Sequence, residues 1–189
     1  ILVLIFILVS RAYSYRKLRL KKYAIIGFLT VFIFQGAFVY LMTSMAISSI
    51  SLENFISLNN VICMTIASLF IGSMYPLTQI YQHEADKKDG VISISYKLGY
   101  IGTFIFSATL FSLAVILMFY YFNLKHQQID LALFVVMMLP VMYHLSIWFN
   151  KVRISTTHAN FENTMTMNML TSVCMNIYFS ILIIINYLP

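Results

Sequence analysis

A short acid-rich segment between two apolar stretches carries the side chains best suited to chemistry. Residues 81–90, YQHEADKKDG, contain three of the six acidic residues in the chain. On a helix, Gln82, Asp86 and Asp89 are separated by four and three residues and therefore share one face. Oxygen ligands grouped in this way suit a hard divalent cation, and Mg²⁺ usually binds through one or two carboxylates together with substrate phosphates. The spacing indicates a candidate magnesium site.

The other polar residues of this segment have different expected places. Glu84 projects from another face of the helix, where it acts from the loop or pairs with Lys88. Gly90 is expected to end the turn. Lys87 and Lys88 add positive charge for an anionic substrate. A mixed-charge connection between membrane helices is more often a plain solvated loop, so the charge pattern alone leaves both interpretations open.

The composition indicates that membrane helices position this segment. Hydrophobic residues make up 61% of the 189 residues and charged residues 10%, whereas a soluble globular protein carries roughly a quarter charged residues. Runs with almost no charge, each long enough for the ~20 residues of a membrane-crossing helix, lie at 23–49, 61–81, 98–124, 131–150 and 163–189. The expected fold class is an all-α membrane protein, a multi-helix transmembrane bundle with five complete spans, and residues 1–189 are expected to form a single transmembrane domain.

The beginning of the chain reads as an incomplete helix. Residues 1–9 are apolar, but this run is about half of a span and Arg11 follows it. The basic cluster comes after the apolar run and no small-residue cleavage site is present, which argues against a signal peptide. The chain also starts without Met. We therefore expect a truncated first helix, with more of the protein upstream of Ile1.

Basic residues predict the orientation of the spans. Of the twelve Lys and Arg residues, six lie in 11–22, three in 81–100 and two in 150–162, whereas the loop at 49–60 has none and the remaining loop has Lys125. This asymmetry follows the positive-inside rule. It predicts a multi-pass integral membrane protein with residues 81–100 in the cytoplasm and the C-terminus on the opposite side. The net charge of +6 is explained by topology and anionic lipid head groups, so no nucleic-acid partner is expected.

The longer context of the acid-rich segment carries a family resemblance. Residues 75–99, YPLTQIYQHEADKKDGVISISYKLG, resemble the second aspartate-rich motif of the UbiA-type membrane prenyltransferases, in which a D-x-x-x-D segment follows an apolar helix. In that motif a Gly follows four residues after the second Asp, and a Leu-Gly pair ends nine residues further on. Asp86, Gly90, Leu98 and Gly99 keep this spacing.

Two other regions agree with the resemblance. Residues 13–27, YSYRKLRLKKYAIIG, are similar to the basic loop after the fourth helix of the family, and residues 161–179 resemble the start of its last helix. The similarity thus covers nearly the whole chain and corresponds to the C-terminal two-thirds of a nine-helix fold. The first motif of the family, N-x-x-x-D-x-x-x-D, would lie upstream of residue 1. The chain therefore resembles a fragment, and we expect it to show no transfer activity when expressed alone.

The resemblance implies a Mg²⁺-dependent enzyme that moves a prenyl group from a prenyl diphosphate donor to a hydrophobic acceptor, aromatic or lipid, within the bilayer. Mg²⁺ and basic side chains would neutralise the departing diphosphate and ease cleavage of the allylic C–O bond. An apolar cavity would keep water away from the carbocation.

The family pattern also suggests individual roles. Asp86 occupies the position of the second Asp, and Gln82 that of the first, where an amide oxygen can coordinate Mg²⁺ but brings no negative charge. Glu84, between them, can compensate. The predicted metal ligands are Asp86, Gln82, Glu84 and Asp89, and the predicted diphosphate contacts are Lys87, Lys88 and His83.

Other interpretations of the chain stay open. Gln82 favours a non-catalytic protein of the same fold that binds a lipid or a partner, and a small-molecule transporter would be favoured by intramembrane ionisable pairs, of which the sequence has none. Gln35 either lines the cavity or joins helices, and Tyr75 and Tyr81, which flank the motif, are candidates for lining the cavity. His144, four residues after Pro140, is interpreted as an interhelical hydrogen-bonding residue in preference to an acceptor-side base.

Overall fold

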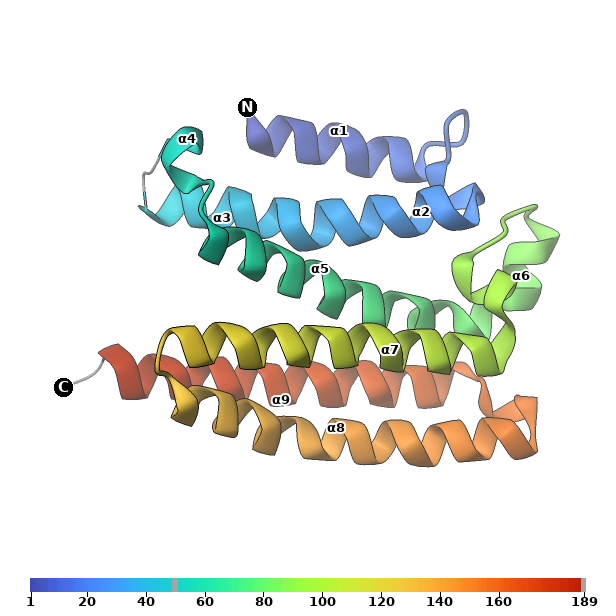
Figure 1. Cartoon of the computed structure of the whole chain (residues 1–189). Coiled ribbons are helices and arrows are strands. Elements are labelled where there is room, and N and C mark those ends of the chain that lie inside the picture. The colour runs from blue at the N-terminus through green and yellow to red at the C-terminus, as the bar shows by residue number, and fades with distance from the viewer. Residues whose placement is uncertain (49–50, 188–189) are drawn as a thin grey trace. The chain divides into compact units, whose positions relative to one another are not determined.

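The computed structural model describes residues 1–48 and 51–187, and no strand occurs in these ranges. The elements in chain order (Figure 1) are α1 (Leu2–Ser14), η1 (Leu20–Lys22), α2 (Ala24–Val31), η2 (Phe32–Ala37), α3 (Phe38–Ser48), α4 (Leu52–Phe55), α5 (Leu58–Gln79), η3 (Ile80–Gln82), α6 (His83–Lys88), α7 (Ile94–Leu124), α8 (Gln128–Ile154), η4 (Thr156–His158) and α9 (Phe161–Tyr187). Of the short η elements, η2 is a π-helical turn and the others are 3₁₀ turns.

Five helical stretches are long and apolar enough to cross a membrane. They are Ala24–Ser48, Leu58–Lys88, Ile94–Leu124, Gln128–Ile154 and Phe161–Ile185. This confirms the expected fold class, an all-α transmembrane protein with five spans, whereas the relation to a nine-helix prenyltransferase fold stays a prediction. The expected first helix is also present, as the shorter apolar helix α1. The expected span ends at residues 49 and 189 lie outside the described residues.

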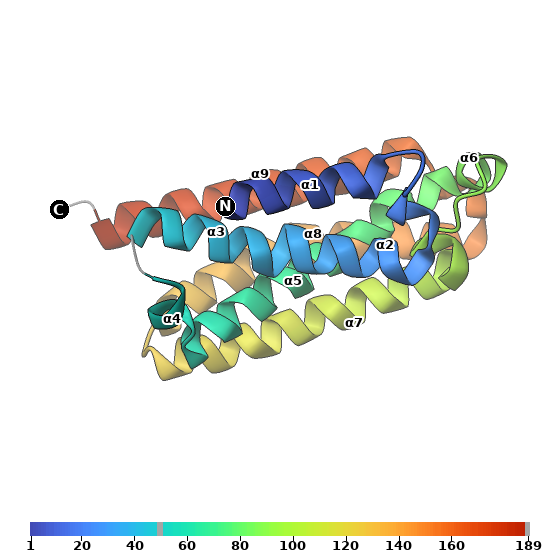
Figure 2. The ribbon, with the colours of Figure 1, turned by 90° about the horizontal axis from the view of Figure 1, so that it is seen from above.

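The chain forms two compact units, Ile1–Leu117 and Met118–Pro189. The first unit contains α1 to α6 and most of α7, and the second contains the end of α7 with α8 and α9. In unit 1, α1 runs beside α2 in both views (Figures 1 and 2). The expectation of a single transmembrane domain stays a prediction.

The closest helix packing in unit 1 lies between α5 and the π-helical turn η2. A Cβ atom added to Gly36 would stand 2.3 Å from Ser68 Cα, and one added to Gly72 would stand 2.6 Å from the ring of Phe32. The hydroxyl of Ser68 also accepts a hydrogen bond from the backbone N–H of Ala37 at 2.9 Å. Small residues let membrane helices approach closely, where van der Waals packing and hydrogen bonds hold them together. Both kinds of contact therefore join α5 to η2.

Unit 2 is built on the pairing of α8 with α9. The indole N–H of Trp148 donates a 2.8 Å hydrogen bond to the backbone carbonyl of His158, and the Phe134 and Tyr178 rings meet edge to face at 5.4 Å. The Nε2 atom of His144 is buried, and no described residue bonds to it. The interhelical hydrogen bond favoured for His144 is thus not formed by this nitrogen.

Candidate functional site

The acid-rich segment is a short helix that ends at a glycine. α5 continues through the 3₁₀ turn η3 into α6, and Gly90 follows with φ 68°. The N–H of Gly90 bonds to the carbonyl of Lys87 at 3.1 Å, and the N–H of Val91 bonds to the carbonyl of Asp86 at 2.8 Å. These two bonds form a Schellman motif, in which the left-handed residue is usually Gly. The prediction that Gly90 ends the turn is confirmed, and this motif fixes the backbone of Asp86.

A second glycine divides the following helix. Gly99 has φ 70° and ψ 177°, so it separates the first residues of α7 from the long span. This backbone region is essentially restricted to glycine. No atom lies within 4 Å of a Cβ added to Gly90 or Gly99, so backbone conformation and not space requires glycine at both positions. Gly90 and Gly99 are the glycines with positive φ among the described residues. The backbone conformation therefore explains why glycine stands at both positions.

We therefore expect Gly90 and Gly99 to differ in how well they tolerate substitution by Asn. Gly99→Ala and Gly99→Asn should each lower the free energy of unfolding by about 1–3 kcal/mol. Gly90→Asn should cost less than Gly90→Ala, because Asn adopts the left-handed conformation more easily. Thermal unfolding of the detergent-solubilised full-length protein measures these differences. Helical Gly102→Ala, whose Cβ would meet only the Leu98 side chain at 3.3 Å, is the control and should be nearly neutral. Equal tolerance of Ala at 99 and 102 would contradict this explanation.

His83 joins α6 to the start of α7 through a buried hydrogen-bonded chain. The residue is 6% exposed, and its Nε2 lies 2.8 Å from the hydroxyl oxygen of Ser95. Ser95 Oγ lies 3.0 Å from Thr103 Oγ1, and the Thr103 hydroxyl donates to the carbonyl of Gly99 at 2.7 Å. The ring of His83 stacks on Tyr100 with a centroid distance of 4.8 Å. This shows how His83 positions the turn; its contact with a diphosphate stays a prediction.

Breaking this chain should destabilise unit 1 without removing a charged group from the site. Ser95→Ala leaves the buried His83 ring nitrogen without its partner, and we expect a loss of about 1–3 kcal/mol in the free energy of unfolding. His83→Ala and the double variant complete a double-mutant cycle. Thermal unfolding should give a non-additive result, with the double variant less destabilised than the sum of the single variants. Strict additivity would mean that the two side chains are not coupled.

The basic loop after α1 lies against the acid-rich turn. Arg19 Nη2 forms a 2.9 Å ion pair with Asp89 Oδ2. The half-buried carboxylate of Asp86 interacts electrostatically with Lys21 and Arg19, which attract it, and with Asp89, which repels it. Segments about 70 residues apart in sequence thus combine carboxylates and cations in one place.

Backbone contacts hold these two segments together. The N–H of Ile92 bonds to the carbonyl of Lys22 at 3.1 Å. Arg19, three residues before Lys22, has φ 41°, a left-handed conformation that is uncommon for a residue with a Cβ. From the sequence alone, Arg19 and Lys21 are explained as topology signals. Their place beside the acid-rich turn depends on the fold.

A polar stripe runs from α5 to Asp86. Tyr75, Gln79, Gln82 and Asp86 follow one another at helical spacings of four, three and four residues, which place them on one face. The Gln79 amide donates a 2.8 Å hydrogen bond to the Tyr75 hydroxyl. The amide N–H of Gln82 points to the carbonyl of Thr78 at 3.4 Å. The buried Oε1 of Gln79 has no hydrogen-bond partner within the described part of the chain.

Tyr13 connects this stripe to a cavity with both apolar and polar walls. Its hydroxyl hydrogen-bonds to that of Tyr75. Both tyrosines of this pair interact electrostatically with the Asp86 carboxylate. Tyr13 also lines a cavity of about 260 Å³, whose other walls are partly apolar, with Phe6 and Phe34, and partly polar, with Ser10 and Thr30. Gln35 lines the same cavity.

The remaining predicted site residues lie at the surface. Glu84, Lys87 and Lys88 are exposed on α6. Across residues 1–48 and 51–187 the ion pair found is that of Arg19 with Asp89, so Glu84 and Lys88 do not pair. The structure thus places Asp86 and Asp89 beside the basic loop, and within the described ranges it gives Glu84, Lys87 and Lys88 no ion pair. A shared metal site with Gln82 stays a prediction.

The oxygen atoms of Asp86 and of the two glutamines near it are of the kind that binds a magnesium ion. Asp86 supplies a carboxylate, Gln82 has its carbonyl oxygen available because its N–H faces Thr78, and Gln79 offers a buried oxygen without a partner. Hard oxygen donors are the ligands that Mg²⁺ prefers, with substrate phosphates completing its shell. Among the described residues, no three His, Cys, Asp or Glu side chains come together as a metal-binding group.

Comparisons of the chain with protein-family models, curated proteins and solved structures find no match.

Proposed function

We propose that this protein is an intramembrane prenyltransferase that transfers a prenyl group from a prenyl diphosphate to a hydrophobic acceptor, aromatic or lipid. The observation that carries the proposal is the position of Tyr13, which lines a cavity with both apolar and polar walls and is bonded to Tyr75 near the charged turn at Asp86. A partly apolar cavity next to a cluster of carboxylates and cations suits an amphiphilic substrate with a charged head and an apolar tail. The spacing of Asp86, Gly90 and Gly99 adds the resemblance to the UbiA-type enzymes.

At the charged end, the residues of the turn would bind the diphosphate and its cation. Asp86 and Gln82 would hold Mg²⁺, with Glu84 and Asp89 as the further predicted ligands. Bound Mg²⁺ would neutralise charge on the departing diphosphate.

Cationic side chains would contact the diphosphate oxygens directly. Arg19 and Lys21, which interact electrostatically with the carboxylates, add their charge to that of the predicted contacts Lys87 and Lys88. His83, the remaining predicted contact, is buried with its Nε2 hydrogen-bonded to Ser95. Several cations around one anion stabilise the charge that develops as the C–O bond breaks.

At the other end, the cavity lined by α1, α2 and η2 would receive the prenyl chain. Its apolar side chains, Phe6, Val9, Val31 and Phe34, would limit the access of water, which would otherwise capture the allylic cation. The Tyr13 hydroxyl is neutral at physiological pH, as tyrosine hydroxyls ordinarily are. It can therefore donate a hydrogen bond at the junction of the apolar and charged regions.

The charge distribution supports a cytoplasmic location for this site. The basic loop at 15–22 is hydrogen-bonded to the turn at 89–93, so both lie at the same end of unit 1. Basic loops remain on the cytoplasmic side. Residues 81–100 would then face the cytoplasm, and the C-terminus the opposite side.

The test is an assay of the full-length protein in membranes with labelled prenyl diphosphate and Mg²⁺. We expect release of diphosphate, appearance of the label in the lipid extract, and loss of both on chelation of Mg²⁺. Binding without release would instead support the non-catalytic lipid-binding alternative, which the neutral Gln82 favours. Absence of both binding and release would contradict the proposal.

A further inference from the structure

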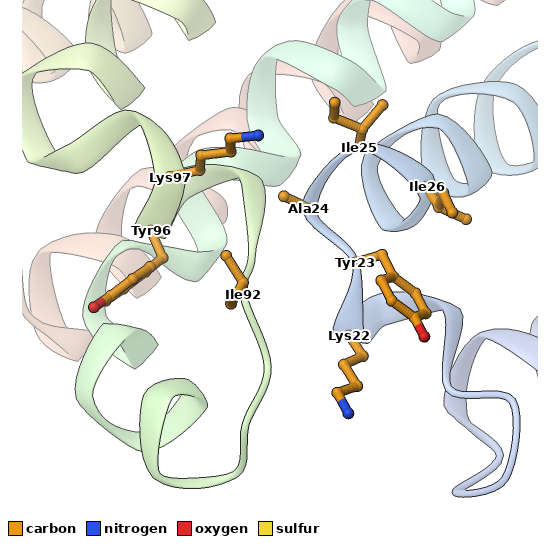
Figure 3. A pocket seen from close by; sticks show the side chains of 8 residues that line it. All are labelled: Lys22, Tyr23, Ala24, Ile25, Ile26, Ile92, Tyr96 and Lys97. Atoms are coloured by element: carbon orange, nitrogen blue, oxygen red, sulfur yellow. The ribbon is translucent and has the colours of Figure 1, made fainter.

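A groove separate from the Asp86 site opens between the start of α2 and the segment that leads into α7. It has a volume of about 690 Å³. Figure 3 shows Lys22 and Tyr23 on one side and Ile92 and Lys97 on the other. The hydrogen bond from the N–H of Ile92 to the carbonyl of Lys22 joins the two sides. No residue of the proposed prenyltransferase site lines this groove.

The two lysines of the groove are available to bind an anion. Lys22 and Lys97 are both exposed. They come from different elements but line the same groove. In the described ranges neither lysine forms an ion pair. Two uncompensated ammonium groups on one groove favour a ligand with negative charge.

The rest of the groove surface is apolar and accessible. Ile25, Ile26 and Ile92 are 55%, 48% and 51% exposed. Ile25 and Ile26 belong to the first turn of α2, where the membrane span that begins at Ala24 starts. Tyr23 lies one residue before this span, and tyrosines are enriched at the membrane–water interface. The groove therefore pairs cations with apolar side chains at the expected depth of lipid head groups.

We propose that this groove binds an anionic phospholipid of the surrounding membrane. The head group lies in the groove that Lys22 and Lys97 line from opposite ends, and an acyl chain lies along Ile25, Ile26 and Ile92. A soluble phosphate would leave the isoleucines exposed, whereas an anionic phospholipid covers them and is attracted by both lysines. Basic side chains near a membrane surface attract anionic lipids. The proposal does not depend on prenyl transfer, because it uses no residue of that site.

Binding can be measured on the purified full-length protein by titration with phosphatidylglycerol or phosphatidylcholine in mixed micelles, read out by native mass spectrometry. We expect preferential retention of phosphatidylglycerol by the wild type. The double variant Lys22→Gln/Lys97→Gln should weaken its binding about tenfold or more. A matched control, Lys17→Gln/Lys151→Gln, removes two exposed lysines that do not line the groove and should bind as the wild type does.

Two further arms separate the lipid from other occupants. Glycerol phosphate, which has the charge without the acyl chains, should not displace the lipid; efficient displacement would overturn the lipid assignment. Ile25→Ser/Ile26→Ser should also weaken retention while leaving both lysines in place. Equal binding of the two lipids by the wild type, or unchanged binding by the lysine variant, would contradict the proposal. Unaltered diphosphate release in the lysine variant would show that the two sites act separately.

Discussion

Asp86→Ala in the full-length protein is expected to lower the rate of Mg²⁺-dependent diphosphate release by about 10²-fold or more. Asp86 is the half-buried carboxylate at the end of the polar stripe, and it faces Lys21 and Arg19. Gln82 and Gln79 contribute amide oxygens without charge, so the alanine variant loses the main negative charge of the predicted metal site. Labelled prenyl diphosphate assayed over a range of Mg²⁺ concentrations measures the effect.

Two control variants make the Asp86 result specific. Glu53→Ala removes an exposed carboxylate on α4, outside the proposed site, and should leave the rate unchanged. Asp86→Glu keeps the charge and should retain more activity than the alanine variant. Thermal unfolding of each variant separates loss of the site from loss of the fold. A folded Asp86→Ala variant with a wild-type rate would remove Asp86 from the metal site.

Gly36→Ala should lower the free energy of unfolding by about 3 kcal/mol, more than Ala at any other glycine of unit 1. The added Cβ would lie 2.3 Å from the Cα and 2.7 Å from the backbone nitrogen of Ser68, so a side-chain rotation cannot relieve the overlap. α5 and η2 would have to separate, which would also lengthen the hydrogen bond from Ala37 to the Ser68 hydroxyl. The thermal midpoint of the solubilised protein is the measurement.

A second substitution distinguishes backbone contact from side-chain contact at Gly36. Ser68→Gly removes the hydroxyl but keeps the backbone atoms that the new Cβ would meet. It should therefore fail to rescue Gly36→Ala. Helical Gly102→Ala should remain close to wild type. A Gly36→Ala protein as stable as the Gly102→Ala protein would show that α5 and η2 are not in this close contact.

The spans could be predicted because a membrane helix is specified by the length and charge of its own segment. The apolar runs that begin near Tyr23 and Val61 correspond to the helical spans at Ala24–Ser48 and Leu58–Lys88. The π-helical turn at Phe32–Ala37 was not predicted. It depends on tertiary contacts, since Gly36 must lie against α5 and the Ser68 hydroxyl must bond to a backbone N–H of the turn. No local pattern encodes such a pair.

The same distinction between local and tertiary information applies to the site. The helical face of Gln82, Asp86 and Asp89 follows from spacing within one turn. In contrast, Arg19 and Tyr13 reach this region from segments more than 60 residues away. From the sequence alone the role of each residue is ambiguous, because many basic loop residues only set topology and many tyrosines in apolar helices only pack between helices. Only the fold shows that they belong to one site.

The most direct test of the central claim, that the turn at Asp86 binds a prenyl diphosphate together with Mg²⁺, is an equilibrium binding measurement. Labelled prenyl diphosphate would be titrated into purified full-length wild-type and Asp86→Asn protein, with and without Mg²⁺. The structure predicts that Mg²⁺ tightens binding to the wild type at least about tenfold, and that Asp86→Asn, which removes charge with little change of shape, loses most of this enhancement. Equal enhancement by Mg²⁺ in both proteins would contradict the claim.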